Sequence, residues 1–190
     1  MKRVFIIHGW DLGPKRDWIP WLKQELKNKG FEVVAPLMPN PDEPKIKEWV
    51  SYLSNIAKDA DEKTYFVGHS IGCQTILRFL EKLPAGRKIG GAVFVAGWFK
   101  LTLETDEEKR ISKPWLESPI DLKKIKTHSS KFISILSDDD YFVPLKENKK
   151  IFENNLGAKI IIEKNKGHFT QSDGVTKLPI ALEAVLEISK

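Results

Sequence analysis

The sequence holds a single cysteine among its 190 residues, Cys73. No disulfide can therefore form within the chain, and the composition favours a reducing compartment such as the cytoplasm. Long hydrophobic runs are also missing, since no stretch approaches the length that a membrane-spanning helix needs. The short apolar run after Lys2 and Arg3 is too brief for the core of a signal peptide. We expect it to be the first strand of a cytoplasmic protein.

Concentrated positive charge is scarce as well, although the formal net charge is +5. The 31 lysines and arginines are dispersed among 26 acidic residues, without an Arg-rich block or a nucleic-acid-binding motif. We therefore expect a solvated, lysine-rich surface, with neither a nucleic acid nor a membrane as partner. The four histidines are scattered without zinc-type spacing, so no metal site is expected.

The most informative stretch that is present is Thr64–Leu77, in which an apolar, β-prone run leads into a Gly-His-Ser-Ile-Gly sequence centred on Ser70. Helix-forming residues with apolar spacing follow at once. This layout predicts a strand that turns sharply into a helix and leaves the hydroxyl of Ser70 exposed at the bend. Gly68 and Gly72 fit that geometry, because a Cβ at either position would collide where strand and helix pass closely.

Two further groups of polar residues follow predicted strands later in the chain. The buried strand 131–136 runs into three aspartates at 138–140, and the strand 159–163 leads to His168. Each group lies just past the carboxyl end of its strand, which is where open parallel sheets place their ligands. The chain order of Ser70, an aspartate near 140 and His168 is the order found in α/β-hydrolases.

With these motifs the sequence resembles the α/β-hydrolase superfamily, and within it the small serine hydrolases of the retinoblastoma-binding-protein-like and YdeN-like family. The resemblance covers nearly the whole chain. Its further markers are Phe5-Ile6-Ile7-His8-Gly9-Trp10, Trp18-Ile19-Pro20-Trp21-Leu22, Met38-Pro39-Asn40-Pro41, Asp140-Tyr141-Phe142-Val143-Pro144 and Gly167-His168-Phe169. It implies that Asp140 is the acid, with the neighbouring Asp138 and Asp139 kept as alternatives.

The resemblance implies a serine hydrolase that cleaves small carboxylic esters through an acyl-enzyme intermediate, with Ser70, Asp140 and His168 as the catalytic residues and no cofactor. The oxyanion would be bound by the backbone N–H groups of Ile71 and of Trp10, or of its neighbour Asp11. The expected partner is a small-molecule ester or acyl substrate, and thioesters and amides stay open.

The alternative, from a different functional class, is a catalytically weak hydrolase-fold protein that acts as a binding or interaction module. Binding of the retinoblastoma protein is not expected. The partner-binding motif of the namesake is Leu-x-Cys-x-Glu, and the residues around Cys73 do not fit it.

The fold class that we expect is α/β, with one three-layer domain over residues 1–190. By analogy with the superfamily, its sheet has six mainly parallel strands in the order 2-1-3-4-5-6. The strands are expected at 4–7, 31–35, 64–69, 91–96, 131–136 and 159–163, and the helices at 17–28, 45–58, 71–83, 145–155 and about 178–188.

Residues 97–127 show no clear periodicity, and we expect a short flap or lid-like segment with one or two short helices. Trp98, Phe99 and Trp115 are candidate walls of the substrate pocket, with ordinary packing onto the body as the alternative for each. His8 is expected to orient its loop, and His128 to be a surface or structural residue.

Overall fold

Six parallel strands form one sheet in the computed structural model, which describes residues 1–190. The strand order is β2-β1-β3-β4-β5-β6, as predicted, and every neighbouring pair is parallel. The strands are β1 (Arg3–Ile7), β2 (Glu32–Val34), β3 (Thr64–His69), β4 (Gly91–Val95), β5 (Phe132–Ser137) and β6 (Lys159–Glu163).

Helices connect successive strands, which is the connection that parallel neighbours require. The α-helices are α1 (Ile19–Asn28), α2 (Ile46–Ile56), α3 (Ile71–Lys82), α4 (Asp106–Glu117), α5 (Leu122–Lys126), α6 (Leu145–Ile151) and α7 (Pro179–Ile188). The expected helix at 145–155 differs in its second half, where the chain widens into the π-helix η1 (Phe152–Leu156). A short 3-10 helix, η2 (Gln171–Asp173), follows β6.

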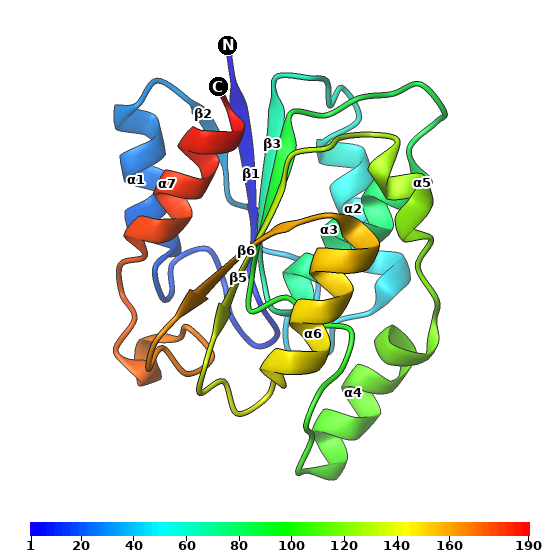
Figure 1. Cartoon of the computed structure of the whole chain (residues 1–190), viewed down its shortest axis with the longest axis vertical. Helices are drawn as coiled ribbons and strands as arrows, with labels where there is room; N and C mark the ends of the chain where they lie inside the picture. The colour runs from blue at the N-terminus through cyan, green and yellow to red at the C-terminus, as the bar shows by residue number, and fades with distance from the viewer.

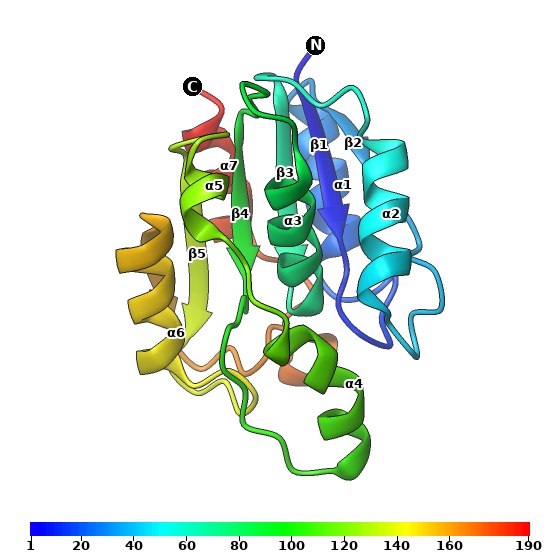
Figure 2. The same ribbon diagram turned by 90° about the vertical axis from the view of Figure 1, so that its right-hand side faces the viewer.

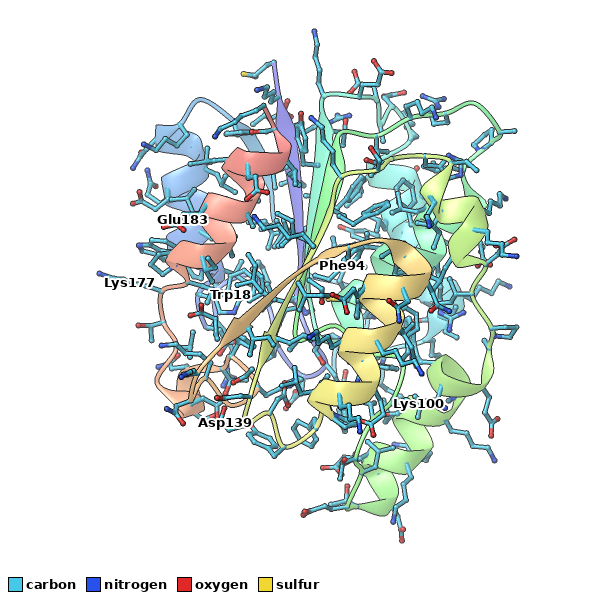
Figure 3. All side chains as sticks on the ribbon, viewed as in Figure 1. Trp18, Phe94, Lys100, Asp139, Lys177 and Glu183 are labelled. Atoms are coloured by element: carbon cyan, nitrogen blue, oxygen red, sulfur yellow. The ribbon has the colours of Figure 1, made fainter.

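The helices cover both faces of the sheet (Figure 1). Helices α1 and α7 lie on one face, and α2, α3, α5 and α6 lie on the other. Each face buries its own hydrophobic core, of 22 residues under α1 and α7 and of 26 residues on the opposite side. Figure 3 shows one member of each core, Trp18 and Phe94, on opposite sides of the sheet. Because both faces are covered, the central strands are continuously buried, and their sequences read as apolar runs.

The carboxyl ends of the strands point toward α4, at the end of the molecule opposite both termini (Figure 2). The turn after β3, the aspartates after β5 and the loop after β6 therefore share one edge of the sheet. This shared edge brings together residues that are about 100 positions apart in the chain.

The 97–127 segment contains two helices, α4 and α5, where one or two short helices were expected. Helix α4 begins with a capping box, in which the Thr105 side chain accepts from the Glu108 amide and the Glu108 carboxylate accepts from the Thr105 amide. Ile111, Ser112 and Trp115 form its buried side. The helix packs across the carboxyl edge of the sheet, where it closes one side of the site described next.

Candidate active site

Ser70 lies at the turn between β3 and α3 in a backbone conformation that L-residues rarely adopt, with φ 52° and ψ −118°. The two glycines around it permit this turn. A Cβ on Gly68 would lie 2.7 Å from the amide nitrogen of Cys73, and one on Gly72 would lie 2.3 Å from the carbonyl oxygen of Ile7. The predicted sharp turn and the predicted collisions are both confirmed.

Asp140 and His168 form a close pair across the loops after β5 and β6. The Nδ1 atom of His168 lies 2.9 Å from Oδ2 and 3.1 Å from Oδ1 of Asp140. Oδ1 also accepts from the amides of Phe142 and Val143, so the carboxylate is held in place and almost fully buried. Since a carboxylate can only accept, Nδ1 carries the proton, which places the lone pair of the neutral ring at Nε2.

The imidazole of His168 is packed between two other rings. The ring centroids of His69 and Phe142 each lie 5.2 Å from that of His168. The Nε2 atom of His69 also lies 2.8 Å from the backbone carbonyl oxygen of His168 and donates to it. Burial, with the nearby His168 adding to it, lowers the pKa of His69 to about 3, so this ring stays neutral and serves as a fixed donor.

Ser70 and His168 line one cavity of about 160 Å³. The structure contains no hydrogen bond between the Ser70 hydroxyl and His168. Catalytic hydrogen bonds of this kind are often long in unliganded sites and shorten when a substrate binds. The three side chains predicted to act together are therefore gathered at one site, with the Asp140–His168 contact already formed.

Two residues that line the cavity with Ser70, Ile71 and Trp10, have free backbone N–H groups. Ile71 is the first residue of α3, so its amide has no acceptor within the helix. The amide of Trp10 donates to no other group of the protein. The amide of Asp11, in contrast, donates to the carbonyl oxygen of Pro41 at 2.7 Å. Of the two alternatives on this loop, Trp10 is the one with a free donor.

The aspartates at 138 and 139 bind the backbone of the loop that carries His168 and do not contact its side chain. Asp138 accepts from the amide of Asn165 at 2.9 Å. Asp139 accepts from the amide of Gly167 at 2.9 Å and from the Ser137 hydroxyl at 2.6 Å. The hydrogen bonds that it accepts lower the pKa of Asp139.

Of the three predicted pocket walls, one lines the cavity. Trp98 does so, whereas Phe99 and Trp115 lie outside it. Phe99 packs on Phe152, with ring centroids 5.0 Å apart, and the indole of Trp115 donates to the carbonyl oxygen of Pro44. For these two residues the expectation of a pocket wall is corrected in favour of packing onto the body.

Most of the remaining cavity wall was missed by the sequence analysis. Its members are Gly9, Leu12, Leu101, Leu103, Glu108, Ile111, Ser112, Tyr141, Phe142 and Thr170. Five of them belong to the 97–127 segment, which has no periodicity over its full length. The Thr105-Asp106-Glu107-Glu108 sequence, with the Thr-x-x-Glu spacing of a capping box, was the available signal for α4.

The other singled-out side chains are structural. His8 is buried, accepts from the amide of Met38 at Nε2 and donates from Nδ1 to the carbonyl oxygen of Gly9, so it orients this loop as expected. Burial lowers its pKa. His128 is buried rather than at the surface and donates to the carbonyl oxygen of Arg87. Burial raises the pKa of Cys73, which keeps this thiol protonated and unreactive.

No group of three or more His, Cys, Asp or Glu side chains is arranged to hold a metal ion. None of the helices combines the length and the apolar character needed to cross a membrane.

Comparison with known proteins identifies the family. Residues 4–187 match the family model described as Serine hydrolase. The chain belongs to this serine hydrolase family. It is 34% identical over 186 residues to the Bacillus subtilis (strain 168) protein YdeN, covering 97% of this chain and 94% of that one. It is 26% identical over 157 residues to the serine hydrolase RBBP9 of Rattus norvegicus, covering 82% and 80% of the two chains.

Solved structures agree with this assignment. The crystal structure of the ydeN gene product superposes with a TM-score of 0.90 at 32% identity, over 99% of this chain and 98% of that one. Est1E from Butyrivibrio proteoclasticus, solved with bound ferulic acid, has a TM-score of 0.75 at 14% identity, over 98% and 87%. At this low identity, the similarity to Est1E concerns the fold alone. The protein has the α/β-hydrolase fold.

Proposed function

We propose that this serine hydrolase cleaves small carboxylic esters through an acyl-enzyme intermediate. The observation that carries the proposal is the Asp140–His168 hydrogen bond of 2.9 Å beside the cavity that Ser70 also lines. This arrangement leaves Nε2 of His168 as a base on the side of the ring away from the carboxylate. A base of this kind activates a serine nucleophile.

In the proposed reaction, Oγ of Ser70 attacks the ester carbonyl carbon while Nε2 of His168 takes the hydroxyl proton. The bond to the alcohol oxygen then breaks, and His168 returns that proton to the departing alcohol. Water attacks the acyl group in the same way, releasing the carboxylic acid and free Ser70. Asp140 holds the imidazole tautomer and stabilises its charged form.

The backbone amides of Trp10 and Ile71 are proposed to bind the oxyanion of the tetrahedral intermediates. Two observations support this proposal: neither amide donates to an acceptor in the protein, and Trp10 and Ile71 both line the cavity. The loss of one oxyanion donor costs roughly 3–4 kcal/mol of transition-state stabilisation in other enzymes.

We further propose that residues 1–190 act as one catalytic unit in which the 97–127 segment is the flap over the substrate. The segment supplies Trp98, Leu101, Leu103 and Ile111 to the cavity wall. Because its one cysteine can form no disulfide within the chain, we propose the reducing cytoplasm as the compartment in which it works.

The first test is labelling of the purified protein with a fluorophosphonate probe, read by intact mass. We expect a single adduct on the unmodified chain and none on Ser70→Ala. Ser70→Ala and His168→Ala should each lower kcat/KM for a short-chain ester by at least about 10³-fold, because the two groups act as one unit. Circular dichroism should show both variants folded. A folded chain that takes up no probe would favour the binding-module alternative.

A further inference from the structure

The cavity beside Ser70 combines the two free backbone amides of Trp10 and Ile71 with a wall whose side chains include one carboxylate. Nine of its 15 lining residues are hydrophobic, and no lysine or arginine is among them. Glu108, Tyr141 and His168 are the titratable side chains of the wall, and Glu108 is the one carboxylate among them. The charge in this wall is therefore opposite in sign to the +5 of the whole chain.

Glu108 is held in place as an ionised group by the capping box of α4. Its Oε2 atom accepts from the amides of Glu104 at 2.8 Å and Thr105 at 3.0 Å. These bonds, the one from Thr105 foremost, lower the pKa of Glu108. Its other oxygen, Oε1, accepts no hydrogen bond and forms no ion pair.

The neighbouring cations on α4 are engaged with other acceptors. Lys109 donates to the carbonyl oxygen of Glu104 at 3.1 Å and lies 3.8 Å from the carboxylate of Asp106. Arg110 forms an ion pair with Glu43 at 2.7 Å. Neither cation lines the cavity, so Glu108 is the charged side chain of α4 that a substrate group meets there, with Lys109 acting on it from outside the cavity.

We propose that Glu108 makes the site selective by charge, so that it accepts compact esters whose acyl group is uncharged or cationic and rejects those whose acyl group carries a carboxylate. The proposal rests on the ester hydrolysis proposed above and names its substrate class. An anionic acyl group would meet the like charge of the half-exposed Glu108, whereas an apolar one gains contacts with leucine and isoleucine side chains. The volume of about 160 Å³ is below the roughly 300–1,000 Å³ of pockets for drug-sized ligands, which favours a compact group.

Three ethyl esters of matched size and branching test the proposal: ethyl 4-methylpentanoate, monoethyl succinate and ethyl 3-(dimethylamino)propanoate. They are neutral, anionic and cationic at pH 7, and all release ethanol, which gives a common readout of kcat/KM. We expect the neutral and cationic esters to exceed the anionic one by about tenfold or more.

Glu108→Gln should reduce that preference over the anionic ester by about three- to tenfold. Glutamine at this position keeps a capping box, so the helix start is preserved and unchanged thermal melting would verify it. Glu107→Gln is the matched control, because Glu107 is an exposed neighbour on α4 outside the cavity. It should leave the ratio unchanged.

An unmodified chain that cleaves the succinate ester as fast as the neutral one would overturn the proposal. So would a ratio that Glu108→Gln fails to change. If none of the esters is cleaved although Ser70 still reacts with fluorophosphonate, the proposed ester hydrolysis fails, and charge selectivity is then read from protection. In that case 4-methylpentanamide should slow labelling of Ser70 at lower concentrations than succinamate, and equal protection by the two amides would overturn the charge selectivity as well.

Discussion

Each of the three consecutive aspartates after β5 holds a different point of the loop that carries His168. Asp138 binds the amide of Asn165, Asp139 binds that of Gly167, and Asp140 binds the imidazole itself. The loop needs such fixing, because Asn165, Gly167 and Phe169 all have positive φ values. One of the three aspartates therefore contacts the side chain of His168, and the other two hold the backbone of the loop before it.

Asparagine substitutions separate these roles. We expect Asp140→Asn to lower kcat by about 10³- to 10⁴-fold, because an amide can hold the imidazole in the wrong tautomer and cannot stabilise its charged form. Asp138→Asn and Asp139→Asn should each cost less than about tenfold, since the amide oxygen of asparagine still accepts from a backbone N–H. Steady-state kinetics on a short-chain ester measures all three. A larger loss in Asp138→Asn than in Asp140→Asn would show that the acid is misassigned.

At the scale of elements, the 97–127 segment is fastened to α6 by one amide side chain. Asn148 is fully buried, and its Oδ1 accepts from the amides of Phe99 at 2.6 Å and Lys100 at 3.0 Å. Its Nδ2 donates to the carbonyl oxygens of Lys100 at 2.9 Å and Pro144 at 2.8 Å. All four hydrogen-bonding positions of the side chain are thus used.

The same segment is also fastened to α3, the helix that follows Ser70. Gln74 donates to the carbonyl oxygen of Trp98 at 2.6 Å. Arg78 donates to the carbonyl oxygens of Trp115 at 2.7 Å and Ser118 at 2.9 Å, at the carboxyl end of α4. Carbonyl groups at that end carry partial negative charge, which suits a guanidinium that has no carboxylate in contact. Helix α3 therefore links the cavity wall to Ser70, in addition to the link to α6 through Asn148.

Removal of the Asn148 side chain should loosen the cavity wall. We expect Asn148→Ala to lower the free energy of unfolding by about 2–4 kcal/mol, because the buried backbone groups that it binds lose their partners. KM for the ester should rise in the same variant. Urea unfolding and steady-state kinetics measure the two effects.

Asn154→Ala is the control for that change, since Asn154 is exposed on η1 and should be neutral to within about 0.5 kcal/mol. Equal stabilities of the two variants would contradict the fastening role of Asn148.

At the scale of the whole molecule, two neutral imidazoles are buried at the carboxyl edge of the sheet, one next to each core. His8 contacts Trp49 of the larger core, and His69 contacts Trp18 of the smaller one. Burial lowers the pKa of both rings, to about 3 for His69. In the unfolded chain both take up a proton near the ordinary value of about 6.5.

Stability should therefore fall as the pH falls. Below pH 6.5 the unfolded chain binds protons that the folded chain does not, so each ring lowers the unfolding free energy by up to about 1.4 kcal/mol per pH unit. For His69 this continues toward pH 3. Asp17, whose pKa is raised by burial, opposes the trend in part at the acid end.

Thermal or urea unfolding between pH 5 and 7 measures this dependence. His69→Gln keeps a donor for the carbonyl oxygen of His168 without a titrating ring, so its stability should depend less steeply on pH than that of the unmodified chain. Equal slopes for the two proteins would contradict a neutral, buried His69.

The sequence by itself determined the alternation of strands and helices, the sharp turn at Ser70 and the gathering of Ser70, the aspartates and His168 at one edge. These features depend on local patterns, namely apolar strands, helical spacing and glycines at a tight turn, and on the rule that parallel strands end together. The resemblance of these motifs to a known family added the strand order, and the parallel pairing confirms it.

The family resemblance favoured Asp140 as the partner of His168, and the tertiary structure shows that contact and decides what lines the cavity. Periodicity and composition do not distinguish Asp138, Asp139 and Asp140, and the backbone path of the turn after β5 sets the direction of each side chain. Glu108 and Ile111 come to Ser70 through packing of α4 across the sheet edge, whereas Trp115, on the same helix, turns into the core. Such placements follow from contacts between distant segments, which composition and periodicity do not encode.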